Sequence, residues 1–476
     1  MRIFTPFRWL ALLLAVGSFS AARASHIRGG DISFASVAST TTGVPRYHVV
    51  VRKFEEMGGP VGTTPSVTLN IISNLSPCGG FGTTGQNITL PRTTAADGPP
   101  AMCTSTATTG LYRAVLFETD VDLPAGQWRL STWDGARIST IQNINNPAGT
   151  YLYIEAFLDN TVTTQDASPQ FESILQPQLS TTALAQHSFS AFDADGDSLR
   201  YESMLALANC GQSVSGTMAT QFHLNFGSGA FEPMVSSSST QGHFSTVVRV
   251  SEYRKAAANR WVLIGSVMRD QTYLLMPSTN QPPTFTTMQV NGGAAQALGP
   301  AIAVRAGQTV SVLLQATDPD AGQALRFASE APKVVPGLSL TRVGATNSEQ
   351  LTWQVPATLP PGRYCIAVGV LDNGCPYNAS EERTLTFIVG STALATRARA
   401  TATDVYPVPF REQVQFTTAP NQAVILVDAL GREVARLTSA PTGLVRWLPA
   451  ASLPAGLYLA RAASSGQPLA RLLRAE

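Results

Sequence analysis

The chain has 476 residues, of which only 13% are charged, and its formal net charge is +1. An average globular protein carries roughly 25% charged residues, so the polar surface must come mainly from uncharged side chains. No basic stripe accompanies the near-zero net charge, which argues against a nucleic acid as partner. At roughly 100–200 residues per domain, the length is enough for three or four domains.

The amino-terminal end has the pattern of a secretory signal peptide. Two arginines precede a short apolar stretch at residues 9–16, and Ala22-Arg23-Ala24 places small residues where signal peptidase cleaves. The apolar stretch is far below the roughly 18–20 residues that cross a bilayer. We therefore interpret residues 1–24 as a signal peptide removed before Ser25, the alternative being a buried amino-terminal helix. No later stretch is long and apolar enough to predict a membrane span.

Residues 25–160 are expected to form a first β domain. Strands are predicted at 47–51, 111–117, 127–133 and 150–158, and no twelve-residue window sustains a helical period. The opening Ser25-His-Ile-Arg-Gly-Gly-Asp-Ile32 resembles the start of large surface proteins associated with gliding motility, with Asp31 where that family usually has Glu. The resemblance extends over most of 25–276, but it carries no activity with it.

Two related units follow, at 166–278 and 281–390. Each runs from a Pro-x-Phe entry through an Asp-x-Asp loop to a Leu-Arg-aromatic strand, which indicates an internal repeat. About 110 residues of short strands suit an immunoglobulin- or cadherin-like β-sandwich. Pro282-Pro283 marks a stiff joint between the units, and residues 391–402 read as a linker without a strand pattern.

The last segment, 403–476, is predicted to be a small β module. Apolar alternation indicates strands at 413–416, 424–427 and 457–461, separated by closely spaced turns. This segment strongly resembles the type A C-terminal sorting domain of cargo proteins of the type IX secretion system. The resemblance rests on four motifs, with Val408 in place of the usual Asn in the first: Tyr406-Pro-Val-Pro-Phe410, Asp428-Ala-Leu-Gly-Arg-Glu-Val434, Leu453-Pro-Ala-Gly-Leu-Tyr458 and the basic end Arg471-Leu-Leu-Arg474. It implies an exported cargo that the type IX machinery recognises and whose final domain is then clipped off.

Five cysteines are compatible with an oxidising compartment. We expect one disulfide between Cys78 and Cys103 and another between Cys365 and Cys375, across a strand-turn-strand. Such a bridge contributes about 2–4 kcal/mol when its geometry is unstrained. Cys210 is left over, and a buried free thiol is its simplest interpretation. No spacing of cysteines and histidines suggests a zinc site.

Asp193, Asp195 and Asp197 form the sharpest constellation of candidate ligands. Three carboxylates at alternate positions in a glycine-bearing turn can converge on one hard cation, and Ca²⁺ prefers such oxygen ligands. The loop is not an EF-hand, because Met204 stands where a bidentate Glu would be needed. Similar loops in cadherin-like repeats bind calcium in some cases and only form an Asx-turn in others. Both interpretations stay open at this stage, and the shorter Asp318-Pro-Asp320 loop is a weaker case.

No catalytic signature stands out. The histidines are scattered, and neither a Gly-x-Ser-x-Gly elbow nor a phosphate-binding glycine loop is present. A pair of sugar-cleaving acids is not excluded, since such residues lie far apart in sequence. The candidates in the first domain are Glu118, Asp120, Asp122, Asp134 and Glu155. Four aromatic residues there could form a sugar platform or belong to the core: Trp128, Trp133, Tyr151 and Tyr153.

The sequence as a whole predicts an all-β, multidomain protein that is secreted or attached to the outer surface. A non-catalytic structural or adhesive role, with Ca²⁺ as a possible cofactor, is the leading hypothesis. The alternative is a secreted carbohydrate-binding protein or hydrolase whose active unit is 25–160. The expected partners are the type IX machinery, through 403–476, and an unidentified surface ligand.

Overall fold

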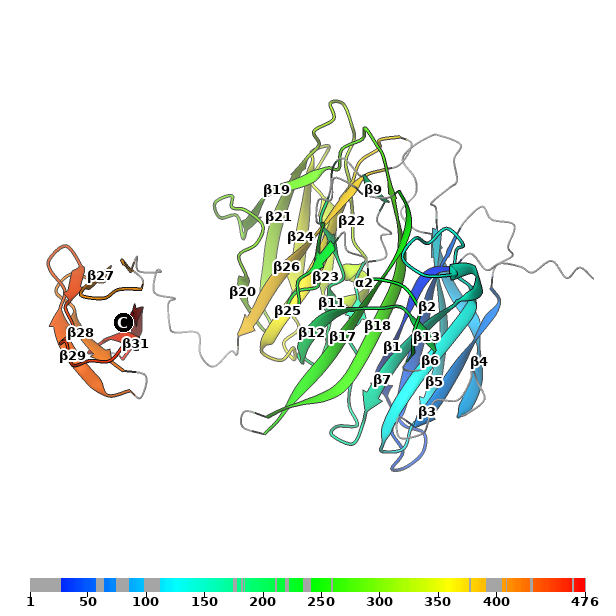
Figure 1. The fold of residues 1–476 in the computed structure, drawn as a ribbon, viewed down its shortest axis with the longest axis horizontal. Helices are drawn as coiled ribbons and strands as arrows, with labels where there is room; N and C mark the ends of the chain where they lie inside the picture. The colour runs from blue at the N-terminus through cyan, green and yellow to red at the C-terminus, as the bar shows by residue number, and fades with distance from the viewer. Residues whose placement is uncertain are drawn as a thin grey trace, which may run out of the picture. The chain divides into compact units, whose positions relative to one another are not determined.

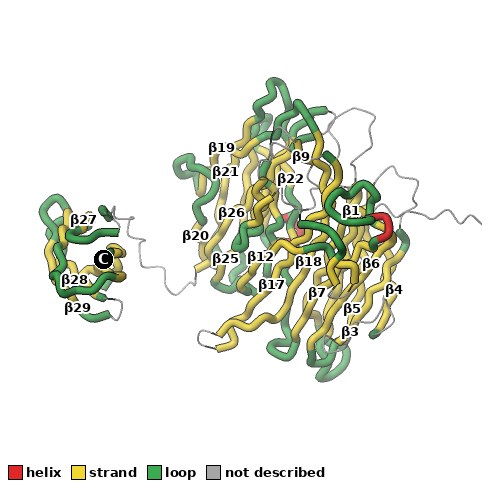
Figure 2. Tube along the Cα trace, viewed as in Figure 1, coloured by secondary structure: helices red, strands yellow, loops and turns green. Residues whose placement is uncertain are grey.

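The computed structural model describes residues 27–56, 64–73, 85–97, 112–173, 178–180, 183, 185–209, 212–218, 222–233, 241–257, 260–375, 378–390, 405–407, 409–428, 431–464 and 466–475. The chain divides into two compact units, Met1–Thr392 and Ala393–Glu476. Almost all the regular structure is strand, and the described helical segments are short turns (Figure 2). The predicted all-β class is therefore confirmed. The predicted signal peptide and the linker 391–402 lie outside the described residues.

Within the described part of the chain, thirteen strands of the first unit form one sheet. Its members are β1 (Ile27–Val37), β2 (Arg46–Glu56), β3 (Ser66–Ser73), β4 (Gln86–Asp97), β5 (Tyr112–Asp122), β6 (Gln127–Ala136), β7 (Tyr151–Asp159), β9 (Gln178–Ser180), β12 (Ser198–Met204), β13 (Leu207–Asn209), β14 (Gln212–Ser213), β17 (Gly242–Ala257) and β18 (Arg260–Met276). The short 3-10 turn η1 (Pro147–Gly149) precedes β7.

This sheet closes on itself. β18 pairs antiparallel with β1 near Asp270 and with β7 near Ser266. The order β18-β1-β2-β5-β4-β3-β6-β7 therefore returns to β18 and forms a ring, which we call the ring body (Figure 1). Closure pairs the backbone groups that the edges of an open sheet would leave exposed.

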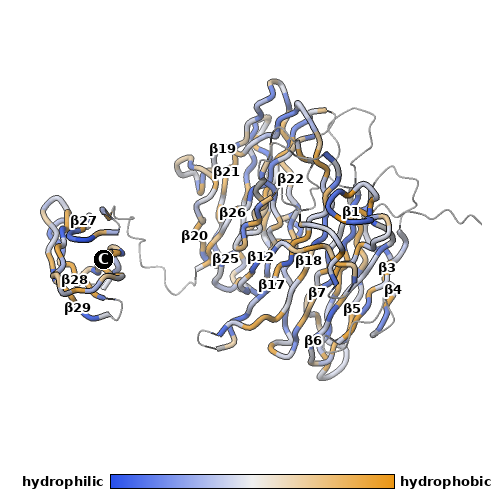
Figure 3. Tube along the Cα trace, in the orientation of Figure 1, coloured by the Kyte–Doolittle hydropathy of each residue, from blue (hydrophilic) through white to orange (hydrophobic). Residues whose placement is uncertain are grey.

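Alternating apolar residues explain why these segments are strands. In β2, Val49 and Val51 are fully buried, whereas Val50 and Arg52 point to the other face and are partly exposed. The same alternation of apolar and polar positions is visible along the neighbouring strands (Figure 3). Successive side chains of a strand point to opposite faces, so one face of each strand supplies the core. The strands predicted in this region are present, with ends shifted by a few residues.

The ring body departs from the predicted boundaries. Residues 25–160 and 166–278 were expected to be separate domains, but β17 and β18 from the second complete the sheet of the first. The remaining short strands of this region pair locally: β8 (Gln170–Phe171) with β11 (Ala191–Phe192), and β16 (Ala230–Pro233) with β10 (His187–Ser188) and β15 (Phe222–Leu224). The cause is the β17–β18 hairpin, whose strands are long enough to pair with two partners along their length.

Residues 281–390 form the predicted β-sandwich. One sheet has the order β19 (Thr284–Val290), β21 (Thr309–Thr317), β24 (Ser348–Gln354), β23 (Leu338–Arg342), and the other has the order β20 (Ile302–Arg305), β26 (Ser380–Gly390), β25 (Gly362–Leu371), β22 (Arg326–Ala328). A short helix, α2 (Ala331–Val334), follows β22. If the strands are lettered in chain order, β19 is A, β20 is A′ and β21 to β26 are B to G. The two sheets then have the orders A-B-E-D and A′-G-F-C, which is the arrangement of immunoglobulin-like sandwiches. Trp353 and Phe387 meet edge to face between them.

The second unit is a smaller sandwich. A sheet of β29 (Glu433–Thr438), β28 (Ala423–Val427), β31 (Gly456–Ala462) and β32 (Pro468–Arg474) encloses a core with the pair β27 (Val414–Thr417) and β30 (Leu444–Trp447). Phe410, Trp447 and Tyr458 pack ring against ring in that core. The three strands predicted here are present at nearly the predicted positions.

One sequence motif builds the same corner in both sandwiches. Leu-Pro-x-Gly-x-Tyr occurs at 359–364 as well as at 453–458. The Tyr364 hydroxyl donates to the Pro360 carbonyl at 2.7 Å, and the Tyr458 hydroxyl donates to the Pro454 carbonyl at 2.6 Å. A tyrosine that bonds back to the backbone at this position is a recurrent feature of immunoglobulin-like folds.

The disulfide predicted between Cys365 and Cys375 is wrong. Cys365 is a free, buried thiol, and Cys375 is disulfide-bonded. The prediction assumed a turn between the two residues, but β25 continues straight from Gly362 to Leu371 and carries them apart at roughly 3.3 Å per residue. Cys78, Cys103 and Cys210 lie outside the described residues.

Candidate functional site

A buried cluster of carboxylates, which we call the acidic centre, lies where three segments of the first unit meet. Asp166 comes from the segment after β7, Asp197 from the turn between β11 and β12, and Glu252 from β17. One carboxylate oxygen from each lies within 4.8 Å of the other two, and all three side chains are buried. Carboxylates gathered in this way repel one another unless a proton, a cation or a basic side chain compensates them.

The predicted ligands Asp193, Asp195 and Asp197 do not converge on one point. Asp193 is the capping residue of the turn, because its Oδ1 accepts the backbone N–H groups of Asp195 and Asp197 at 3.0 Å each. Asp195 lies at the edge of the centre and accepts the backbone N–H of Ala167 at 2.8 Å. Of the three, only Asp197 contributes to the closest carboxylate group. The Asx-turn interpretation is thus correct for the backbone, and the candidate ligand set becomes Asp166, Asp197 and Glu252, with Asp193 beside it.

Arg254 compensates part of this negative charge. Its Nη2 donates to Asp166 Oδ1 at 2.8 Å and to Asp197 Oδ2 at 2.6 Å, and its Nε donates to Asp197 Oδ1 at 2.9 Å. Burial acts to lower the pKa of Arg254, but the hydrogen bonds and charges of Asp197, Asp166 and Asp195 outweigh it and raise the pKa above its ordinary value. One guanidinium therefore serves several carboxylates.

Glu252 receives no hydrogen bond from Arg254 among the described contacts. It is fully buried, and neither of its oxygens has a hydrogen-bond donor among the described residues. Burial, together with the charges of Asp166, Asp193 and Asp197, raises the pKa of Glu252 well above its ordinary value. This shift favours the neutral, protonated form of Glu252 when no cation is bound.

Burial also raises the pKa values of the two neighbouring aspartates. The pKa of Asp166 rises to about 7, because burial and the nearby aspartates outweigh the stabilising charge of Arg254. The pKa of Asp193 also rises to about 7, mainly through burial, despite the backbone hydrogen bond from Asp197. One oxygen of each carboxylate lacks a hydrogen-bond donor in the described part of the chain. The centre is therefore left with acceptor oxygens and a shortage of positive charge, which are conditions that suit Ca²⁺.

The acidic centre borders the 281–390 sandwich. At Gly196, in the turn between β11 and β12, an added Cβ would lie 2.7 Å from the Tyr364 hydroxyl. The preceding Phe192 belongs to the sandwich core, with its ring centroid 5.5 Å from that of Tyr364. A ligand that fixes the turn would therefore also fix the joint between the ring body and the sandwich.

Sequence reasoning missed Asp166 and Glu252. Each lies far from the Asp-x-Asp-Gly-Asp turn along the chain, and neither has a spacing that marks it as a ligand. The pairing of β12 with β17 places Glu252 opposite Leu199, directly after the turn. Gly265, the cross-strand partner of Glu252, leaves space for the Glu252 side chain. An added Cβ at Gly265 would lie 1.7 Å from Glu252 Oε1.

The other candidate residues have structural partners. The carboxylate of Asp318 accepts the backbone N–H of Asp320 at 2.8 Å in a simple turn. The acids proposed for sugar cleavage are all in ion pairs: Glu118 and Asp120 with His48, Asp122 with Arg46, Asp134 with Lys53 and Glu155 with Arg129. Among the four aromatic residues, Trp128, Trp133 and Tyr153 pack against core clusters, whereas Tyr151 is 45% exposed.

Comparisons with known proteins do not assign a family. No protein-family model matches the sequence, and no curated protein matches it. Among solved structures, the chain is similar to Drosophila N-cadherin EC1-4, with 12% identity, 63% of this chain and 73% of that chain covered, and a TM-score of 0.21. It is similar to the tandem Ig repeats of Dlar, with 13% identity, 47% and 100% covered, and a TM-score of 0.20. With scores this low, the sandwich assignment rests on the sheet orders described above.

No helix among the described residues has both the length and the apolar character needed to cross a membrane.

Proposed function

We propose that this chain is an exported surface or secreted protein with a non-catalytic, structural or adhesive role, and that Ca²⁺ at the acidic centre rigidifies its working part. The observation that carries the proposal is the buried carboxylate of Glu252, which has no donor among the described residues and lies beside Asp166 and Asp197. Three separate segments supply the ligands, so a bound cation joins the turn 193–197 to β17 and to the segment after β7. The rigid joint then holds the sandwich against the ring body.

Delivery by the type IX secretion system is the second part of the proposal. Residues 403–476 act as the sorting domain, and cleavage within 391–402 releases the working part. A compact second unit with its own core supports this role, because a detachable address must fold without the rest of the chain. The Asp428 motif also forms a defined turn: the Asp428 side chain accepts the backbone N–H of Arg432 at 2.9 Å, and Gly431 has a φ of +83°.

Truncation tests the export proposal. In a bacterium with a type IX system, the full chain is expected in the medium or on the surface, and a chain ending at residue 402 is expected in the periplasm. Substituting Gly431 by Val, which the positive φ disfavours, should cause partial periplasmic retention, whereas the same substitution at Gly322 in the 281–390 sandwich should not. Export of the truncated chain at the full-length level would overturn this part of the proposal.

A further inference from the structure

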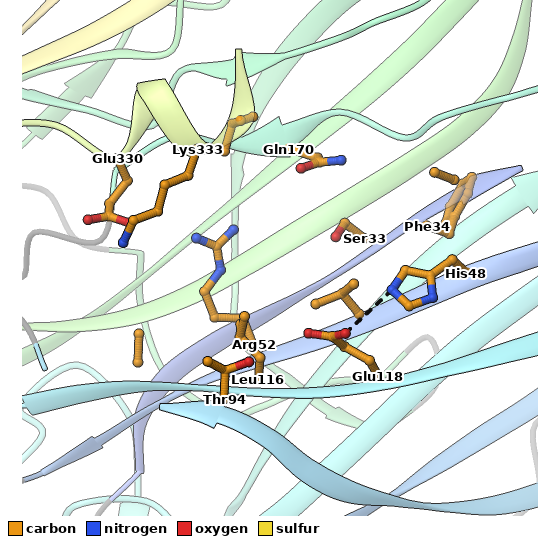
Figure 4. Close-up of a pocket in the computed structure, with 14 residues that line it drawn as sticks. Ser33, Phe34, His48, Arg52, Thr94, Leu116, Glu118, Gln170, Glu330 and Lys333 are labelled. Carbon is orange, nitrogen blue, oxygen red and sulfur yellow. Dashed lines mark ion pairs between the residues drawn. The ribbon is translucent and has the colours of Figure 1, made fainter. Parts of the chain in front are cut away.

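A cleft lies on the outer face of the ring body. Its floor comes from β1, β2 and β5, and its far wall is the short helix α2 of the sandwich (Figure 4). The cavity has a volume of about 440 Å³, within the roughly 300–1,000 Å³ typical of small-molecule sites. It is therefore large enough for a ligand rather than a few water molecules.

The floor of the cleft is unusually apolar for an outward face. Ala35, Val50 and Leu116 alternate along their strands with buried core residues, so they point away from the core. Val334 of α2 faces them from the opposite wall. A hydrocarbon group bound on these four aliphatic side chains is removed from water. Its burial contributes a favourable free energy of roughly 25 cal/mol per Å² of apolar area.

One end of the cleft carries Arg52 and Lys333, and Lys333 is paired there with Glu330 at 2.5 Å. Arg52 and Arg269 share a single carboxylate: Arg52 Nε donates to Asp31 Oδ1 at 3.2 Å, and Arg269 Nε donates to Asp31 Oδ2 at 2.9 Å. Burial lowers the pKa of Arg269 to about 10, and the charge of Arg52 also acts to lower it. The carboxylates of Asp31 and, more weakly, Glu382 act to raise it. Arg52 donates through Nη2 to the carbonyl of Phe171, whereas its Nη1 has no acceptor in the described part of the chain. Figure 4 shows this guanidinium rising from β2 into the cleft between Lys333 and Ser33.

The other end of the cleft carries carboxylates that contact His48. His48 lies between Glu118, with Nε2 3.6 Å from the carboxylate, and Asp120, with Nδ1 at 2.8 Å. The Thr93 hydroxyl also donates to Glu118 at 3.1 Å. A second acidic group on a ligand would meet these carboxylates and be repelled. The cleft thus favours one anionic group, at the Arg52 end only.

We propose that this cleft binds a small monocarboxylic acid with an apolar body. The carboxylate of the ligand accepts from Arg52 Nη1, whereas Lys333 keeps its own partner, Glu330. The hydrocarbon part lies on Val50 and Leu116 under Val334. Such a site shares no lining residue with the candidate ligand set of the acidic centre and adds a ligand-binding role to the structural one.

Calorimetry with octanoate tests the proposal on the full chain. Octanoate is expected to bind saturably at one site, and 1-octanol, which has the same apolar body and no charge, at least tenfold more weakly. Arg52→Gln should weaken octanoate binding by about tenfold or more, the loss of one charged hydrogen bond. The matched control is Arg46→Gln on the same face of β2, where the arginine pairs with Asp120 and Asp122 outside the cleft; it should leave the affinity unchanged.

A second variant guards against a folding defect at Arg52. Leu116→Trp fills the cleft without removing an ion pair, so it should abolish octanoate binding while the melting temperature stays near that of the parent chain. The proposal is overturned if octanoate does not bind, if octanol binds as tightly, or if Arg52→Gln or Leu116→Trp folds normally and keeps the parent affinity.

Discussion

At the scale of single residues, the acidic centre depends on the carboxyl group of Glu252, which is buried without a hydrogen-bond donor among the described residues. Gly265 leaves room for the Glu252 carboxyl, since any Cβ at that position would overlap Oε1. An unpaired buried charge costs several kcal/mol, so the group takes up a proton or a cation. The pKa of Glu252 is raised because the carboxyl is buried, and no hydrogen-bond donor among the described residues offsets this effect.

A second buried acid lies at the joint between the ring body and the sandwich. Glu172 is fully buried and accepts the Ala367 backbone N–H and, at 3.0 Å, the Ser190 hydroxyl. Burial raises its pKa to about 8, despite these two hydrogen bonds. Unlike the carboxylates of the acidic centre, Glu172 is not part of the candidate ligand set, so calcium is not expected to affect it directly.

Stability without calcium is expected to fall between pH 5 and pH 8. Asp166 and Asp193 have folded pKa values of about 7, and Glu172 of about 8, all above the ordinary values of 3.8 and 4.5. The folded state therefore binds more protons than the unfolded state in this range. The contribution of these groups to the free energy of unfolding is largest below about pH 4, and it falls as pH rises until it is lost at about pH 7 to 8. At about 1.4 kcal/mol per pKa unit, the loss is on the order of a few kcal/mol for each of the three groups.

Urea unfolding in EDTA at pH 5, 6, 7 and 8 measures this dependence. Glu172→Gln should make the slope shallower, because it removes one of the three titrating groups. Saturating calcium should also make it shallower, since the cation replaces the protons at the acidic centre. Stability that rises from pH 5 to pH 8 in EDTA would contradict these assignments.

The residue scale also shows what the sequence could and could not provide. The Asp193 turn was predictable, because an Asx-turn depends on neighbours within four residues. The ligand set was not, because Asp166 and Glu252 reach the turn only through the folding of the chain and the pairing of β12 with β17. The convergence expected from the aspartate spacing fails because Asp193 uses its Oδ1 to hold the turn and Asp195 turns towards Ala167.

At the scale of elements, a motif quoted for the sorting domain proves to be a general sandwich corner. Leu-Pro-x-Gly-x-Tyr makes the same tyrosine hydrogen bond in the 281–390 sandwich and in the second unit. Its presence therefore indicates a β-sandwich rather than an export signal. The resemblance to the type IX sorting family rests on the remaining motifs and on their order.

The two tyrosine corners can be compared directly. Tyr458→Phe removes one hydrogen bond, worth about 1 kcal/mol, so backbone amides of the second unit should exchange with solvent about fivefold faster. Tyr364→Phe should have the same effect in 281–390 and leave the second unit unchanged. Hydrogen exchange followed by mass spectrometry on the full chain distinguishes the two regions. Equal effects of either variant on both regions would show that the corners do not act locally.

Strand positions could be predicted at this scale, whereas strand pairing could not. Apolar alternation located most strands of the 27–160 region, since each strand buries one face. Alternation does not say which strand lies beside which. The separation of 25–160 from 166–278 therefore failed at β18, whose residues pair with β17 on one side and with both β1 and β7 on the other.

At the scale of the whole molecule, the account depends on calcium joining segments that are far apart in sequence. The acidic centre lies beside the corner that Tyr364 forms, so a bound ion would make the ring body and the sandwich unfold together. Without the ion, five carboxyl groups around one guanidinium weaken the same joint: Asp166, Asp193, Asp195, Asp197 and Glu252. The proposed structural or adhesive role requires the rigid form, since a surface protein transmits force through its joints.

The most direct test is the melting temperature of the full chain in calcium and in EDTA. At a calcium concentration about 100 times the dissociation constant, binding adds about 2.7 kcal/mol, which is a rise of roughly 5 °C. Glu252→Gln should abolish this rise, and Glu349→Gln, at a buried acid in the sandwich, should preserve it. A parent chain that melts at the same temperature in millimolar calcium and in EDTA would contradict the account.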